Sequence, residues 1–117
     1  MASIVTTFTG SELSPVYFDV PVYSGSDQII RMYIRPQVQG GIASQTFSLM
    51  LQQAYSDPSP ALSVAGTIND PTGCVVDFII AAAQAVGLSG RYIATAARTD
   101  AGNAGPLAVG QARAVEF

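Results

Sequence analysis

The side chains that most often carry enzyme chemistry are scarce in this sequence. Its 117 residues include no histidine and no lysine, and Cys74 is the single cysteine. A catalytic thiol or hydroxyl needs a base beside it. Without histidine and lysine, neither group has an imidazole or an amine that could activate it. One cysteine without histidine also fails to make a zinc site. We therefore expect no catalytic site, no metal site and no cofactor.

Carboxylates remain, because acid–base hydrolysis requires only Asp and Glu. Four of the eight acids lie in predicted turns, where Asp and Asn side chains commonly bond to their own backbone. The same explanation covers Asn69 with Asp70 and Asp100 with Asn103, which are otherwise candidate calcium ligands. Asp77 lies in the middle of a predicted strand, where we expect it to be solvated or paired with arginine.

The composition favours a surface that docks against other proteins. Charged residues make up 11% of the chain and hydrophobic residues 49%, whereas an average soluble domain is about 25% charged. The net charge is −3, which gives no electrostatic footprint for nucleic acid or an anionic membrane. All the cations are arginines, the residue that protein interfaces enrich while they deplete lysine.

Turn-forming stretches divide the chain into segments of strand length. The turns are rich in Gly, Pro, Asp and Asn and lie at 24–27, 39–41, 56–60, 69–73 and 100–105. Between them, side chains alternate with the period of two that is typical of half-buried strands. In 28–35, for example, Ile30, Met32 and Ile34 share one face. The predicted strands span 4–8, 16–23, 28–35, 45–54, 62–68, 74–80, 91–99 and 107–117.

Residues 81–87 depart from this alternation. Alanine is the best helix former, and Gly87 can end a helix, so the segment predicts one or two helical turns that join two strands. The alternative is a longer helix over 78–86, which would be apolar nearly all round and would need complete burial.

Several short strands with almost no helical periodicity are typical of a two-sheet β-sandwich. We expect an all-β protein in which residues 15–117 form a single β-sandwich domain. Residues 1–14 fit the pattern least well. They are predicted to be an N-terminal arm or an edge strand that reaches a neighbouring molecule.

A series of short motifs between about residues 27 and 115 resembles a known family. The chain carries Gly90-Arg-Tyr92 at the start of a late strand and Leu107-Ala-Val-Gly110 at the start of the last one. In the order of such motifs it resembles the immunoglobulin-like modules of tailed-bacteriophage particles, and most of all the N-terminal domain of baseplate upper proteins. The resemblance implies an immunoglobulin-like antiparallel β-sandwich of about seven strands, with the helical turn near 81–87.

The resemblance implies a non-enzymatic virion structural protein, made in the host cytoplasm. A free-standing module of this size suits a capsid decoration, or cement, protein. Such proteins bind the major capsid protein and often form trimers, so a homo-oligomer is expected. One alternative is a tail, baseplate or fibre-attachment module. Another is a carbohydrate-binding module for host attachment, since exposed tyrosines can stack on sugar rings.

The interface is expected to use apolar, aromatic and arginine side chains of the first third of the chain. A terminal arm can add a strand to the sheet edge of a neighbour, and Tyr and Arg are enriched at interfaces. The candidate interface residues are Ile4, Val5, Phe8, Tyr17, Tyr23, Arg31, Tyr33 and Arg35.

Overall fold

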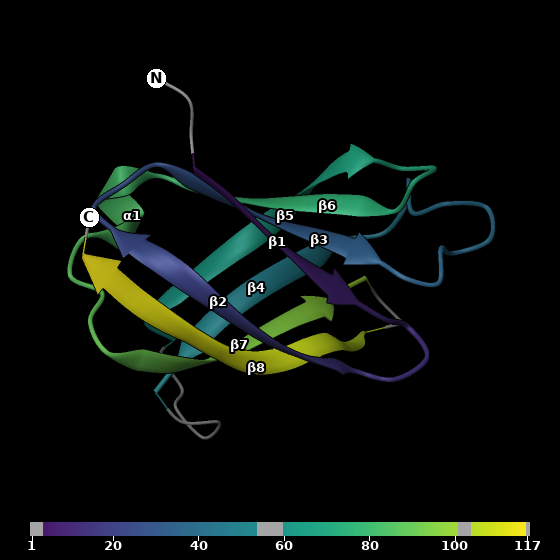
Figure 1. The fold of residues 1–117 in the computed structure, drawn as a ribbon. Coiled ribbons are helices and arrows are strands. Elements are labelled where there is room, and N and C mark those ends of the chain that lie inside the picture. The colour runs from purple at the N-terminus through teal and green to yellow at the C-terminus, as the bar shows by residue number, and fades with distance from the viewer. Residues whose placement is uncertain (1–3, 54–59, 101–103, 117) are drawn as a thin grey trace.

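The computed structural model describes residues 4–53, 60–100 and 104–116, and within them the chain is almost entirely β-strand (Figure 1). One short helix, α1 (Ala82–Ala85), lies between the sixth and seventh strands. The predicted turn at 56–60, the middle of the loop at 100–105 and residues 1–3 of the expected arm fall wholly or largely outside the described residues. The strands are β1 (Ile4–Gly10), β2 (Val16–Ser24), β3 (Gln28–Ile34), β4 (Phe47–Gln52), β5 (Leu62–Asp70), β6 (Val75–Ile80), β7 (Arg91–Arg98) and β8 (Gly105–Glu116).

The eight strands form one mixed sheet in the order β1-β3-β6-β5-β4-β7-β8-β2. The sheet curves until it nearly closes into a barrel. Strand β5 links its two halves, because Ala65 pairs with Ser48 of β4 while the next residue, Gly66, pairs with Phe78 of β6. The prediction of an all-β fold is confirmed. The described residues contain eight strands, one overlapping each predicted segment, whereas the resemblance implies about seven.

The prediction of a purely antiparallel arrangement is wrong at both ends of the sheet. Strand β1 pairs parallel with β3, and β2 pairs parallel with β8, whereas the remaining pairs are antiparallel. The turn between β1 and β2 is short enough for a hairpin, yet the two strands join opposite ends of the sheet. Alternation shows which side chains face inward, but its period of two is the same whatever the direction of the neighbouring strand.

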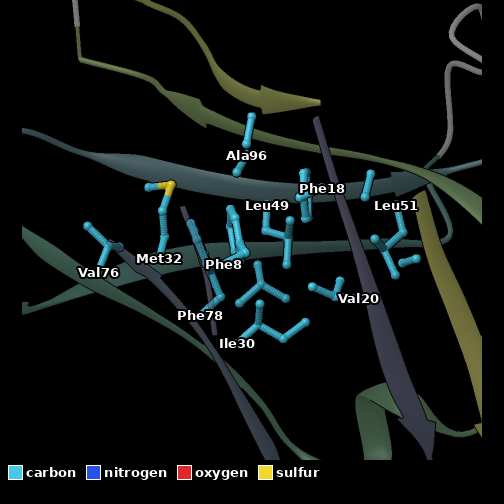
Figure 2. Close-up of a cluster of buried hydrophobic side chains, with 14 of the residues drawn as sticks. Phe8, Phe18, Val20, Ile30, Met32, Leu49, Leu51, Val76, Phe78 and Ala96 are labelled. Carbon is cyan, nitrogen blue, oxygen red and sulfur yellow. The ribbon is translucent and has the colours of Figure 1, made fainter. Parts of the chain in front are cut away.

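The interior is built from the apolar side chains that alternation assigns to the inward face (Figure 2). Ile30, Leu49 and Phe78 have no exposed surface, and burial of one such side chain contributes about 1.5–3 kcal/mol. Phe8 of β1 stacks on Phe18 of β2 with ring centroids 4.3 Å apart. The two ends of the sheet therefore meet through side chains.

The predicted helical turn is confirmed as α1, which connects β6 to β7. Asp27 holds its start, because Oδ1 of Asp27 accepts a hydrogen bond from the Ala82 N–H at 2.7 Å. The alternative of a longer helix over 78–86 is wrong. Residues Val75–Ile80 form strand β6, in which Phe78 and Ile80 face the core.

Cys74 is fully buried, and it precedes β6 and is not part of a strand, although the predicted strand over 74–80 includes it. Its φ of 60° lies in the left-handed region, which is uncommon for a residue other than glycine. The sulfur accepts a hydrogen bond from the Val38 N–H at 3.3 Å. Cys74 thus fixes the loop after β3 against the turn that precedes β6.

Candidate interaction surface

Half of the candidate interface residues lie together on one outer surface. Val5, Arg31 and Tyr33 point outward from β1 and β3, and Arg35 follows β3 directly. Strand β6 pairs with β3 and continues the same surface. We call the outward side chains of β1, β3 and β6, together with those of the paired part of β5 and with Arg35, the β3 face.

The other four candidates are not part of this face. Phe8 is buried and Ile4 is partly buried, and both point into the sheet interior. Tyr17 and Tyr23 point outward from β2, in the other half of the sheet. The structure therefore separates the two β2 tyrosines from the arginines and Tyr33.

Three aliphatic side chains form a row across the β3 face. Val5 is the register partner of Ile29, and Ile29 is the partner of Ile79. Val5 and Ile79 are 45% and 52% exposed. Directly opposed side chains of adjacent strands lie about 5 Å apart, so these residues make a continuous apolar strip. Ile29 and Ile79 are not among the candidate interface residues, although the same period of two places both side chains outward.

The next row of the β3 face contains an ion pair. Nε of Arg31 donates to Oδ1 of Asp77 at 2.7 Å, and Nη2 donates to Oδ2 at 3.2 Å. The Asn69 amide also donates to Oδ2, at 2.9 Å. Burial acts to raise the pKa of Asp77, but the hydrogen bonds from Arg31 and Asn69 outweigh it and keep the pKa below its usual value. The expected arginine partner of Asp77 is confirmed, and both charges are compensated within the face.

Arg35 lies over the ring of Tyr33 at the far end of the face. Its guanidinium carbon is 5.5 Å from the ring centroid, a distance at which a cation is attracted to the π face. Nη1 also donates to the carbonyl oxygens of Ile34 and Gly73, at 2.8 and 2.9 Å. This arginine is therefore held in a fixed position although it is exposed.

The outer surface of β2 and β8 has a different chemistry. Tyr17 is 69% exposed. Asp19 lies two residues after Tyr17 in β2, and its carboxylate accepts hydrogen bonds from Gln111 at 3.0 Å and from Arg113 at 3.2 Å. Both hydrogen bonds lower the pKa of Asp19, and the bond from Gln111 has the larger effect. An exposed ring beside planar polar groups is suited to a polar, flat ligand.

Strands β1 and β2 face each other across a gap in the hydrogen-bond ladder, which we call the seam. The carbonyl of Gly10 accepts from the Arg35 N–H at 2.9 Å, so the even-numbered residues of β1 direct their backbone groups toward β3. Backbone groups of successive residues point to opposite sides of a strand, and Val5, Thr7 and Thr9 therefore direct theirs toward the seam. In the described residues no backbone hydrogen bond joins β1 to β2.

Two small pockets lie apart from the β3 face. The larger, of about 240 Å³, includes Arg98, whose guanidinium is bound to Asp100 at 2.7 Å and to Glu12 at 3.4 Å. The smaller, of about 170 Å³, is lined by the ends of β2 and β8 and by residues 88–90. Over the described parts of the chain, no three His, Cys, Asp or Glu residues gather as metal ligands. None of the helical segments described is long and apolar enough to cross a membrane.

No protein-family model matches this chain, and a search of curated proteins finds no match. A proposal about function therefore depends on the surfaces described above and on the motifs in the sequence. Among those surfaces, the β3 face contains the largest number of candidate residues and an exposed apolar strip.

Proposed function

We propose that the protein is a non-enzymatic structural component of a tailed-bacteriophage particle, and specifically a capsid decoration protein. The observation that carries this proposal is the β3 face, where an aliphatic strip lies beside an ion pair that is already compensated. Covering such a face buries apolar area, worth roughly 25 cal/mol per Å², and leaves no unpaired charge at the Arg31–Asp77 pair. The sequence motifs that resemble phage modules are the reason for assigning the protein to a phage particle.

The resemblance to phage modules also implies a particular all-β architecture, the immunoglobulin-like sandwich. We interpret the nearly closed sheet as the two facing layers of an immunoglobulin-like sandwich. One layer is β1-β3-β6-β5 and the other is β4-β7-β8-β2, with β5 shared at the corner. Strands that pass from one sheet to the other make such corners in sandwiches. In this interpretation the β3 face is the outer surface of one layer.

The partner in this proposal is the major capsid protein, and the decoration protein acts as a homo-oligomer in the virion. Its low charge supports docking, because few charged side chains have to be dehydrated when the surface is covered. We assign it no role with nucleic acid or membrane.

Incorporation into particles tests the proposal. Ile79→Glu places a charge in the apolar strip, and Ser63→Glu places the same charge on the exposed outer side of β5 in the other half. Particles assembled with each variant are purified, and the bound protein is quantified by mass spectrometry. We expect Ile79→Glu to lose most of its occupancy and Ser63→Glu to keep it. Absence of the wild-type protein from the particle contradicts the proposal.

The copy number separates decoration from the alternative of a tail or baseplate module. The copy number of a decoration protein is comparable to that of the capsid subunits, whereas the copy number of a baseplate protein is comparable to the far smaller number of tail subunits. The same mass spectrometry, normalised to the major capsid protein, measures this ratio. A ratio close to that of the tail proteins would replace the decoration assignment with the baseplate one.

A carbohydrate-binding role is the second candidate, and the exposed ring of Tyr17 favours it. The ring lies on the surface that also presents Asp19, Gln111 and Arg113, which can bond to sugar hydroxyls. A glycan array with wild type and Tyr17→Ala tests it. Binding that Tyr17→Ala abolishes supports this role, and no signal above background for wild type removes it.

A further inference from the structure

Two arginines lie directly opposite each other on the outer surface of β7 and β8. Arg91 of β7 is the register partner of Arg113 of β8, and both residues are exposed. We call these two residues the arginine pair. Directly opposed side chains of adjacent strands lie about 5 Å apart, and like charges in this arrangement are destabilising. The repulsion is relieved only as far as negative charge lies beside the pair.

The protein supplies one carboxylate to this arginine pair. Asp19 accepts a hydrogen bond from Nε of Arg113 at 3.2 Å. Arg91 makes no hydrogen bond or ion pair within residues 4–53, 60–100 and 104–116. The arginines that do donate to a partner are Arg31, Arg35, Arg98 and Arg113. The arginine pair and Asp19 together therefore carry one positive charge in excess, which an external anion can balance.

Groups that suit a sugar continue from the arginine pair along β2. Tyr17 and Asp19 lie on the same outer side of the sheet as Arg113, and Tyr17 is 69% exposed. The Tyr17 ring offers an apolar face to a sugar ring. Asp19 already accepts from Gln111 and Arg113, but an ionised carboxylate has about four acceptor positions. It can therefore also accept hydrogen bonds from sugar hydroxyls.

The length of this surface indicates a ligand of more than one sugar ring. Tyr17 is the register partner of Val109, and Arg113 lies four residues further along β8. At the rise of a β-strand, four residues span about 13 Å. A ring stacked on Tyr17 therefore leaves the arginine pair to a neighbouring unit of the same chain of sugars.

We propose that this surface binds an acidic oligosaccharide, with a sugar carboxylate between Arg91 and Arg113 and a neighbouring ring on Tyr17. The proposal rests on the carbohydrate-binding role described above and names the ligand class of that site. Docking of the β3 face to a capsid would leave the site free, because β2, β7 and β8 lie in the other half of the strand order.

The charges on this surface favour a sparsely charged sugar over a polyanion. In the register of the strands, Asp19 lies between Tyr17 and the row of the arginine pair, and the whole chain carries a net charge of −3. A nucleic acid or a sulfated polymer would bring repeated negative charges against both. A single carboxylate meets the planar guanidinium groups, which match its geometry, while uncharged hydroxyls contact Asp19.

A glycan array with matched acidic and neutral sugars tests the ligand class. The array carries glycans that contain uronic or sialic acids beside the same glycans with the carboxyl group reduced to an alcohol. We expect wild-type protein to bind acidic glycans and to lose most of the signal on their reduced counterparts. Tyr17→Ala should weaken binding to the same acidic glycans.

Arg91→Gln tests the arginine pair, with Ser63→Glu as its control. Each substitution lowers the net charge by one, but Ser63 lies on the exposed outer side of β5, away from the pair. Titrations of the acidic glycan with the strongest signal should show Arg91→Gln weakened roughly fivefold at low salt and Ser63→Glu unchanged. Urea denaturation should show Arg91→Gln as stable as wild type or more so, because a like-charge contact is removed.

The possible failures of the two proposals are distinguishable. Equal binding to acidic and reduced glycans, or full binding by Arg91→Gln, overturns the acidic ligand and leaves a carbohydrate-binding role in place. Binding to dextran sulfate that Tyr17→Ala leaves intact also overturns it, since the surface then attracts anions in general. The absence of any glycan signal for wild type removes both the ligand class and the carbohydrate-binding role.

Discussion

Gly110 lies where β8 passes closest to the backbone of β2. A Cβ at this position would overlap the main-chain atoms of Phe18, and those atoms cannot move without disturbing the β2–β8 pairing. We expect Gly110→Ala to lower the free energy of unfolding by about 1–3 kcal/mol.

Gly105 offers a matched control for this prediction. It lies in the same strand, but a Cβ there would meet nothing within 4 Å. Gly105→Ala should therefore be neutral or slightly stabilising. Urea denaturation of both variants measures the difference, and equal stabilities would contradict the close approach at Gly110.

The Arg31–Asp77 pair predicts a pH-dependent contribution to stability. The pKa of Asp77 is lowered in the folded state, so its ionised form stabilises the fold above about pH 4. This stabilisation is lost as the pH falls through the folded-state pKa. Asp77→Asn should lower the free energy of unfolding by about 1 kcal/mol at neutral pH. Denaturation at neutral and at acidic pH should show the difference shrink below pH 4, and a constant difference would contradict this explanation.

At the scale of the elements, α1 is too short to be stable by itself and depends on its contacts. The hydrogen bond from the Ala82 N–H to Asp27 ties its start to the turn between β2 and β3. Asp27→Ala should lower the free energy of unfolding by about 0.5–2 kcal/mol, whereas Asp27→Asn keeps an acceptor and should lose less. Urea denaturation ranks the variants, and equal losses would show that this bond does not stabilise α1.

The strands were predictable from the sequence because each carries its own alternation. In β3, Ile30, Met32 and Ile34 are fully buried while Arg31 and Tyr33 are not, as the period of two requires. The helical turn was predictable for a similar reason, since an alanine-rich stretch ending at glycine is a local signal. These elements are therefore determined within a few neighbouring residues.

The arrangement of the strands was less predictable, because it depends on contacts between distant residues. Nothing within residues 4–10 specifies that they pair with residues 28–34 and run parallel to them. The candidate surface shows the same limit. Arg31 and Asp77 are 46 positions apart, and Ile79 joins Val5 only through the register of the strand between them. Side-chain direction is a local property, whereas adjacency is a property of the whole sheet.

At the scale of the whole molecule, the seam predicts an alternating pattern of backbone protection. The amides of Thr6 and Phe8 point toward β3, whereas those of Val5 and Thr9 point toward the seam. In the folded protein, the amides of Val5 and Thr9 should exchange with solvent faster than those of Thr6 and Phe8. Hydrogen exchange followed by NMR measures each amide separately. Equal protection along β1 would show that the seam edge is already paired within one molecule.

Strand β5 lies in the middle of the strand order, opposite the seam. A Cβ on its Gly66 would press on the side chains of Val76, Phe47 and Phe78, so packing around the corner is tight. The gap between β1 and β2 and this tightly packed corner therefore lie at opposite positions of the strand order. A larger side chain at position 66 should thus disturb the pairing of β5 with both of its neighbours, because Val76 and Phe78 belong to β6 and Phe47 belongs to β4.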